Sequence, residues 1–136
     1  TAEARDDEMH ARIVRHKADR PFGWTTLEET LEIAGVLQAQ GSTDQSIVVD
    51  CLTLWLSNLF ECRRDVELET RRLCAALASA RAQIFLVSNE IGLGLVPETP
   101  LGRAFRDAQG RLNQRIAAQA DVVEFVAAGL PLRLKG

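Results

Sequence analysis

Two short runs of large apolar residues constrain the fold of this chain more than any other feature of its sequence. Residues 47–49 and 84–87 are apolar, with no polar residue in alternation. Such runs are typical of strands that are buried on both faces of a parallel sheet. Between them, Leu52, Trp55 and Leu59 recur at helical spacing. Strands that alternate with helices predict an α/β fold with an open, mostly parallel sheet and flanking helices.

Periodicity also predicts the remaining elements of the chain. A first helix carries Met9, Ile13 and His16 on one face and ends before Pro21. A second helix is expected to start at a capping box, at residues 25–28 or 26–29, and to stop near residue 41. The further predictions are a turn over 42–45, helices over 66–80 and 101–120, and strands over 122–126 and 130–134.

Length and composition limit the kinds of function that this chain can have. Its 136 residues are expected to form one compact domain, residues 1–136. With 16 basic and 19 acidic residues, a net charge of -3 argues against a nucleic-acid surface. No apolar run approaches the roughly 20 residues that span a bilayer. The three cysteines form no close CxxC pair, so we expect neither a zinc site nor disulfides, and a cytoplasmic location.

Polar residues follow both predicted central strands. In open α/β sheets ligands bind beyond the carboxyl ends of the strands, so Asp50, Asn89 and Glu90 are candidate site residues. A carboxylate placed like Asp50 can serve a magnesium ion or its water. The alternatives are that Asp50 caps the following helix and that Asn89 and Glu90 belong to an ordinary loop.

The predicted helix over residues 101–120 has an unusual polar face. It carries Arg103, Arg106 and a glycine, Gly110, which costs about 1 kcal/mol relative to alanine in a helix interior. Arginine suits bidentate contact with phosphate or carboxylate. This face is therefore predicted to meet a ligand phosphate or a neighbouring subunit, unless it is simply solvated.

His16 is the candidate for nucleophilic or acid–base chemistry. Of the two histidines, it is the one flanked by Arg15 and Lys17, which would favour a neutral imidazole and attract phosphates. The alternative is that His16 completes a partly buried face with Met9 and Ile13.

Three blocks of sequence resemble one enzyme family in order and spacing. The first runs from Asp6-Asp7-Glu8-Met9 through His16 to Glu28, the second is 50–59, and the third is 87–117. Together they resemble the bifunctional adenosylcobinamide kinase / adenosylcobinamide-phosphate guanylyltransferase family of cobalamin biosynthesis.

The resemblance implies a P-loop NTPase-like fold, a homotrimer and two reactions. ATP or GTP, with Mg2+, would phosphorylate adenosylcobinamide, and GTP would then donate GMP to the product, releasing pyrophosphate. His16 matches the histidine that carries GMP. Asp50 matches an acidic residue that serves nucleotide and metal. The other residues that match the blocks are expected at the nucleotide: Glu28, Asn89, Glu90, Arg103 and Arg106.

One departure from the family pattern is large. No Gly-x-x-x-x-Gly-Lys-[Ser/Thr] phosphate loop occurs in the sequence. A strand, that loop and a helix, about 30 residues together, are expected to precede Thr1. The alternatives are a truncated or degenerate module that binds nucleotide or corrinoid without catalysis, and a different P-loop kinase.

Overall fold

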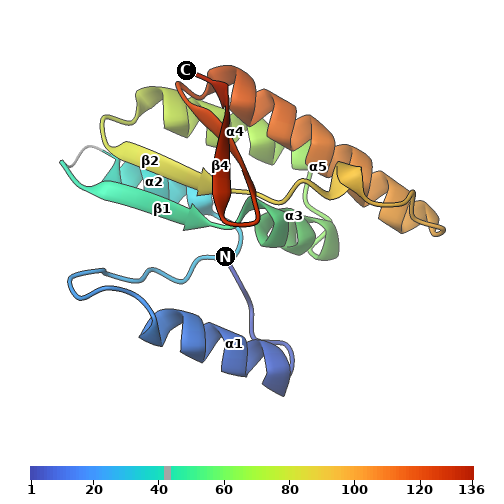
Figure 1. Cartoon of the computed structure of the whole chain (residues 1–136), viewed down its shortest axis with the longest axis horizontal. Coiled ribbons are helices and arrows are strands. Elements are labelled where there is room, and N and C mark those ends of the chain that lie inside the picture. Colours follow the sequence, from blue (N-terminus) through green and yellow to red (C-terminus); the bar gives the residue numbers. More distant parts are fainter. Residues whose placement is uncertain (42–43) are drawn as a thin grey trace. The chain divides into compact units, whose positions relative to one another are not determined.

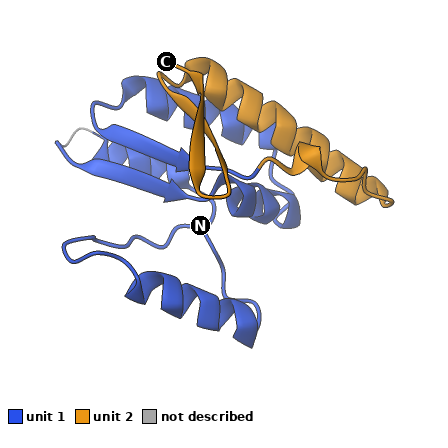
Figure 2. Cartoon of the chain, in the orientation of Figure 1, with its two compact units in different colours: residues 1–89 blue, residues 90–136 orange. Residues whose placement is uncertain are grey.

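The computed structural model describes residues 1–41 and 44–136 and divides into two compact units, residues 1–89 and 90–136 (Figure 2). A single domain over 1–136 stays a prediction. The predicted turn at 42–45 includes Ser42 and Thr43, which lie outside the described residues.

The first unit is an α/β unit built on a parallel strand pair (Figure 1). The two strands pair in parallel, from Ser46 opposite Gln83 to Asp50 opposite Val87. A parallel pair needs a long crossover, which two helices provide here. This confirms the predicted fold class. The elements in chain order are α1 (Asp7–Ala18), α2 (Ile33–Gln40), β1 (Ser46–Asp50), α3 (Leu52–Glu61), α4 (Val66–Ser79) and β2 (Gln83–Val87).

Helix α3 supplies more buried apolar side chains to the core of this unit than any other described element. Its predicted apolar face is confirmed, because Leu52, Trp55, Leu56 and Leu59 are at most 1% exposed. The indole Nε1–H of Trp55 donates to the carbonyl of Leu31 at 2.8 Å, so this large side chain is both packed and satisfied. Helix α4 packs on α2 and α3.

The strand pair differs from its prediction in one respect. Burial alternates along both strands, so that Val49 is buried while Val48 and Phe85 are more than 40% exposed. The sequence predicted burial on both faces. Whether the second face is covered depends on what packs against it, which an apolar run does not specify.

The predicted start of the second helix is wrong, since α2 begins at Ile33. The carbonyl oxygens of Thr30 and Leu31 accept hydrogen bonds from the side chains of Asn58 and Trp55 on α3. The Glu29 carboxylate accepts from the backbone N–H groups of residues 31 and 32. These tertiary and local bonds occupy backbone groups that a helix over 25–32 would need.

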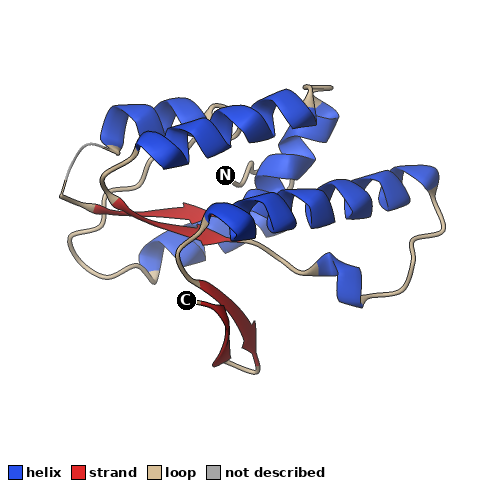
Figure 3. Ribbon diagram, turned by 90° about the horizontal axis from the view of Figure 1, so that it is seen from above, coloured by secondary structure: helices blue, strands red, loops and turns tan. Residues whose placement is uncertain are grey.

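The second unit consists of a long helix and a hairpin (Figure 3). Its elements are η1 (Ile91–Leu93), α5 (Pro100–Gln119), β3 (Val123–Ala127) and β4 (Leu130–Lys135). The last two strands occur where they were predicted, but they pair antiparallel. Two residues, Ala128 and Gly129, join them at positive φ, which is the geometry of a tight hairpin turn and too short for a parallel crossover.

Candidate functional site

One ion pair joins two of the predicted site residues. His16 Nε2 lies 2.7 Å from Asp50 Oδ2. His16 belongs to the last turn of α1, and Asp50 ends β1. The side chains remain 57% and 38% exposed, so a solute can reach both. Residues that are 34 positions apart are therefore brought into direct contact at an accessible place.

The surroundings of the pair bear on the structural alternatives for both residues. Met9 and Ile13 are half-buried, as the alternative expected, but the His16 side chain is 57% exposed and contacts Asp50. The N-cap residue of α3 is Cys51, which makes no side-chain hydrogen bond to the helix. Asp50 is therefore not the N-cap of α3. Neither of these structural alternatives accounts for the pair.

The pairing also distinguishes the two nitrogens of the imidazole. A carboxylate accepts hydrogen bonds, so Nε2 carries the proton that it shares with Asp50. Nδ1 of His16 has no hydrogen-bond partner among the described residues. In that tautomer Nδ1 keeps its lone pair. A histidine held by a carboxylate with one free basic nitrogen can act as a nucleophile or as a base.

Charged groups surround the end of α1. Lys17 Nζ lies 2.6 Å from Glu28 Oε1, and the Arg20 guanidinium donates to Thr26 Oγ1. Hydrogen bonding to Lys17 holds the pKa of Glu28 below its ordinary value, so this carboxylate is ionised at neutral pH. The Arg15 side chain makes no ion pair with the described residues and is available to an anion.

Asn89 lies at the same sheet edge as Asp50. Asp50 pairs with Val87 in the parallel register, and Asn89 follows two residues later. The Asn89 N–H donates to Thr53 Oγ1 at 3.0 Å. Thr1 also reaches this edge, because its hydroxyl donates to the Cys51 carbonyl and accepts from the Cys51 N–H. No role was predicted for either threonine, although Thr53 lies in the second family block.

The three remaining predicted residues belong to the second unit and bind its own backbone. Glu90 Oε1 accepts from the Gly92 N–H at 2.9 Å, and Arg106 donates to the Gly92 carbonyl at 2.6 Å. Arg103 donates to the carbonyls of Pro97 and Glu98. In the structure these side chains hold the 90–99 loop beside the start of α5. Their role at a nucleotide stays a prediction.

Gly110 was expected to permit the close approach of a ligand or subunit. A Cβ built on it meets no described atom within 4 Å, so the structure leaves open space there. No described residue uses the glycine as a contact point.

The described residues contain no group of three or more His, Cys, Asp or Glu side chains that could cage a metal ion. The Asp50 oxygen that His16 does not contact, Oδ1, could supply one carboxylate ligand. This fits Mg2+, which usually binds one or two carboxylates together with water and substrate phosphates.

No helix in the described part of the chain is long and apolar enough to cross a membrane.

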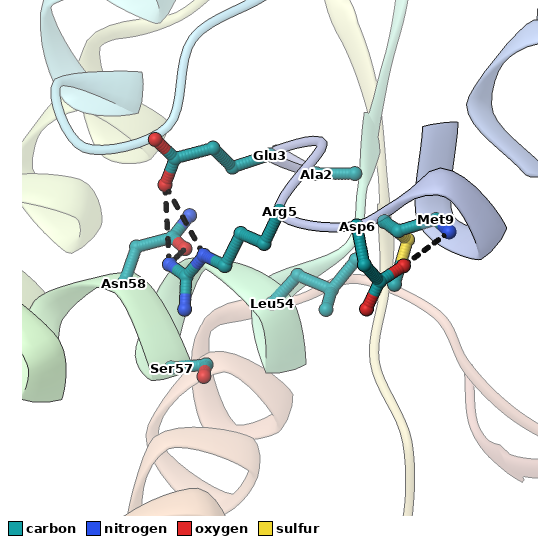
Figure 4. A pocket seen from close by; sticks show the side chains of 8 residues that line it. All are labelled: Ala2, Glu3, Arg5, Asp6, Met9, Leu54, Ser57 and Asn58. Carbon is teal, nitrogen blue, oxygen red and sulfur yellow. Dashed lines mark hydrogen bonds and ion pairs between the residues drawn. The ribbon is translucent and has the colours of Figure 1, made fainter.

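A pocket of about 220 Å³ opens between α3 and the segment before α1 (Figure 4). The Arg5 guanidinium points into it but binds Glu3 and Asn58, and it is paired with Glu61. With its cation neutralised, the pocket is not suited to a phosphate group. Its lining residues are Ala2, Glu3, Arg5, Asp6, Met9, Leu54, Ser57 and Asn58.

Comparison with known proteins gives one consistent result. The model of the family described as cobinamide kinase / cobinamide phosphate guanyltransferase matches residues 1–134. Three relatives carry the name bifunctional adenosylcobalamin biosynthesis protein. CobP of Pseudomonas aeruginosa is 46% identical over 138 residues, covering 100% of this chain and 80% of the relative. CobU of Salmonella typhimurium is 37% identical over 150 residues, and CobU of Escherichia coli 34%, each covering 99% of this chain and 83% of the relative. These matches confirm the resemblance seen in the three blocks.

Proposed function

Since the chain belongs to the cobinamide kinase / cobinamide phosphate guanyltransferase family, we propose that it transfers GMP from GTP to adenosylcobinamide phosphate through a guanylylated His16. Phosphorylation of adenosylcobinamide by ATP or GTP precedes this transfer. The observation that supports the proposal most directly is the contact of His16 Nε2 with Asp50, which leaves Nδ1 free for attack.

The first half-reaction starts at His16 Nδ1. Its lone pair attacks the α-phosphorus of GTP, the new N–P bond forms, and the bond from that phosphorus to the bridging oxygen breaks. Pyrophosphate leaves with the bonding electrons. The imidazole becomes cationic during the attack, and the Asp50 carboxylate stabilises that charge through the proton on Nε2.

The second half-reaction releases the histidine. A phosphate oxygen of adenosylcobinamide phosphate attacks the same phosphorus, and the N–P bond breaks. GMP is thereby joined to the corrinoid phosphate through a new P–O bond. His16 returns to its neutral tautomer with Nε2 still directed to Asp50. The two displacements need no net oxidation or reduction.

Charged groups near His16 serve the triphosphate in this proposal. Arg15 can contact the leaving pyrophosphate, and Glu28 and Asn89 are proposed to contact the nucleotide. Asp50 Oδ1 would hold Mg2+, which supplies neutralisation of phosphate charge when bound. Glu90, Arg103 and Arg106 are kept as predicted nucleotide contacts of the second unit. A homotrimer and a cytoplasmic location complete the proposal.

The experiment that tests this function is covalent labelling. Full-length protein is incubated with Mg2+ and GTP labelled at the α-phosphate, and acid-labile, alkali-stable label is expected on His16. Digestion and separation of the two phosphohistidine isomers should give the Nδ1-linked form. His16→Ala should lose the label while it remains folded by circular dichroism, and His10→Ala, on the same helix, should keep it.

Two outcomes would count against the proposal. Label that persists in His16→Ala places the nucleophile elsewhere. Absence of label in the unaltered protein, with GTP still bound, favours a module that binds nucleotide without catalysis.

A further inference from the structure

Residues 19–27, the aromatic loop, expose large apolar side chains directly after the helix that carries the proposed nucleophile. Phe22 is completely exposed, Trp24 is 49% exposed and Leu27 is 58% exposed. Exposed apolar side chains gathered on one segment mark a binding surface more often than isolated ones do. Two aromatic rings within three residues form the most prominent such group in the first unit.

Two side-chain contacts hold the two ends of this loop together. Lys17, in the last turn of α1, pairs with Glu28 just after the loop, and Arg20 binds Thr26 across the loop. Lys17 directly follows His16 in sequence, so the loop starts and ends at the helical turn that carries His16. The exposed rings therefore belong to a segment whose two ends are joined at that turn.

A glycine between the two rings sets the form of the loop. Gly23 has φ +95°, a conformation that residues with a Cβ rarely adopt. Nothing lies within 4 Å of the position that its Cβ would take, so the glycine serves the backbone turn and not a packing contact. On either side of this turn, Phe22 is fully exposed and Trp24 is half exposed.

We propose that Phe22 and Trp24 stack against the purine base of the nucleotide whose α-phosphorus His16 attacks. This inference rests on the proposed function, because it takes the position of the phosphorus from Nδ1 of His16. Only the ribose separates the base from that phosphorus, so the base must lie near His16. Aromatic side chains stack on the π face of a base, and the unpaired Arg15 provides positive charge for the phosphates.

Tryptophan emission can report this contact. Trp24 is half exposed, whereas Trp55 is 1% exposed and hydrogen-bonded to Leu31. In full-length protein, GMP should quench the exposed emission and protect it from iodide. Trp24→Phe should lose the response but keep GMP affinity, because phenylalanine retains an aromatic face.

Binding measurements separate base contacts from phosphate contacts. The variants Phe22→Ser and Trp24→Ser should each weaken GMP binding about tenfold or more, the range measured when a stacking ring is removed. Binding of tripolyphosphate, which has no base, should stay unchanged. Val14→Ala, which removes a similarly exposed apolar side chain from α1, is the matched control and should bind GMP normally.

Three outcomes would overturn the inference. They are unchanged GMP affinity in both serine variants, an equal loss of GMP and tripolyphosphate binding, and emission that responds to adenosylcobinamide but not to GMP. The labelling of His16 is measured separately. If label forms on His16 but Trp24 emission does not respond to GMP, the proposed base contact is wrong, whereas His16 remains supported as the nucleophile. If Trp24 responds but no label forms, the transfer mechanism is wrong.

Discussion

The candidate residues of the two units have different kinds of partner. In the first unit, His16 and Asp50 bind each other through side chains and leave Nδ1 and Oδ1 free. In the second unit, Arg103 and Arg106 donate to backbone carbonyls of the adjoining 90–99 loop, and Glu90 accepts from the Gly92 N–H and from the Asn113 side chain. The first arrangement presents reactive atoms to a solute, whereas the second holds a segment of chain in place.

The difference teaches that polar residues selected by the same kind of sequence pattern can have two roles. Some keep polar atoms accessible to a solute, and others stabilise the conformation of a nearby loop. Similar arguments from sequence selected members of both groups. Asp50 and Glu90 each follow a predicted strand. Basic residues drew attention both to His16 and to the polar face with Arg103 and Arg106. What separates them is the identity of the hydrogen-bond partner. A charged side chain that is bonded to carbonyl oxygens of its own loop has less capacity left for a ligand.

The largest effect is expected from removing the charge of Asp50. Asp50→Asn should lower the rate of GMP transfer to His16 about a hundredfold or more, because the amide cannot stabilise the imidazolium that forms. The rate is followed with GTP labelled at the α-phosphate. Asp44→Asn, an exposed acid before β1, serves as the control. If Asp50→Asn transfers GMP at the normal rate, the His16–Asp50 pair has only a structural role, and the contrast between the two units disappears.

A middle-sized effect is expected in the second unit. Arg106→Gln should weaken the tether to the Gly92 carbonyl, whose charged hydrogen bond contributes about 1–2 kcal/mol. Amide hydrogen exchange over residues 91–98 should become faster, and any accompanying loss of GTP affinity measures the nucleotide contact proposed for Arg106. Arg111→Gln, on the same helix, should change neither quantity. A clear loss of GTP affinity with unchanged exchange would make Arg106 a ligand contact and remove the contrast between the units.

The smallest effect concerns the Lys17–Glu28 pair at the base of the aromatic loop. Because Lys17 lowers the pKa of Glu28 below its ordinary 4.5, the pair stabilises the loop above pH 4.5. That contribution is lost as pH falls through the lowered pKa of the folded state. Carboxyl NMR shifts of Glu28 should titrate below 4.5, and Lys17→Met should return them toward that value. An unchanged titration in Lys17→Met would show that the pair does not form in solution.

The sequence by itself predicted the class of fold and the family. Helical spacing placed α1, α3, α4 and α5, and the two apolar runs placed β1 and β2, because hydrophobic periodicity is a local property of the chain. The three blocks pointed to the family that the comparisons confirm. His16 and Asp50 were named separately, one from its basic neighbours and the other from its place after a strand.

Only the tertiary structure decided which groups meet. No local pattern places His16 against Asp50, 34 residues away, or indicates that Nδ1 is the nitrogen left free. The start of α2 depends on Asn58 and Trp55, which take backbone carbonyls that a longer helix would have used. Periodicity reports the faces of single elements, whereas hydrogen-bond partners are chosen among all groups that packing brings within reach. For that reason the chain carries its elements in its sequence, and the contacts that define the site arise only when those elements are packed together.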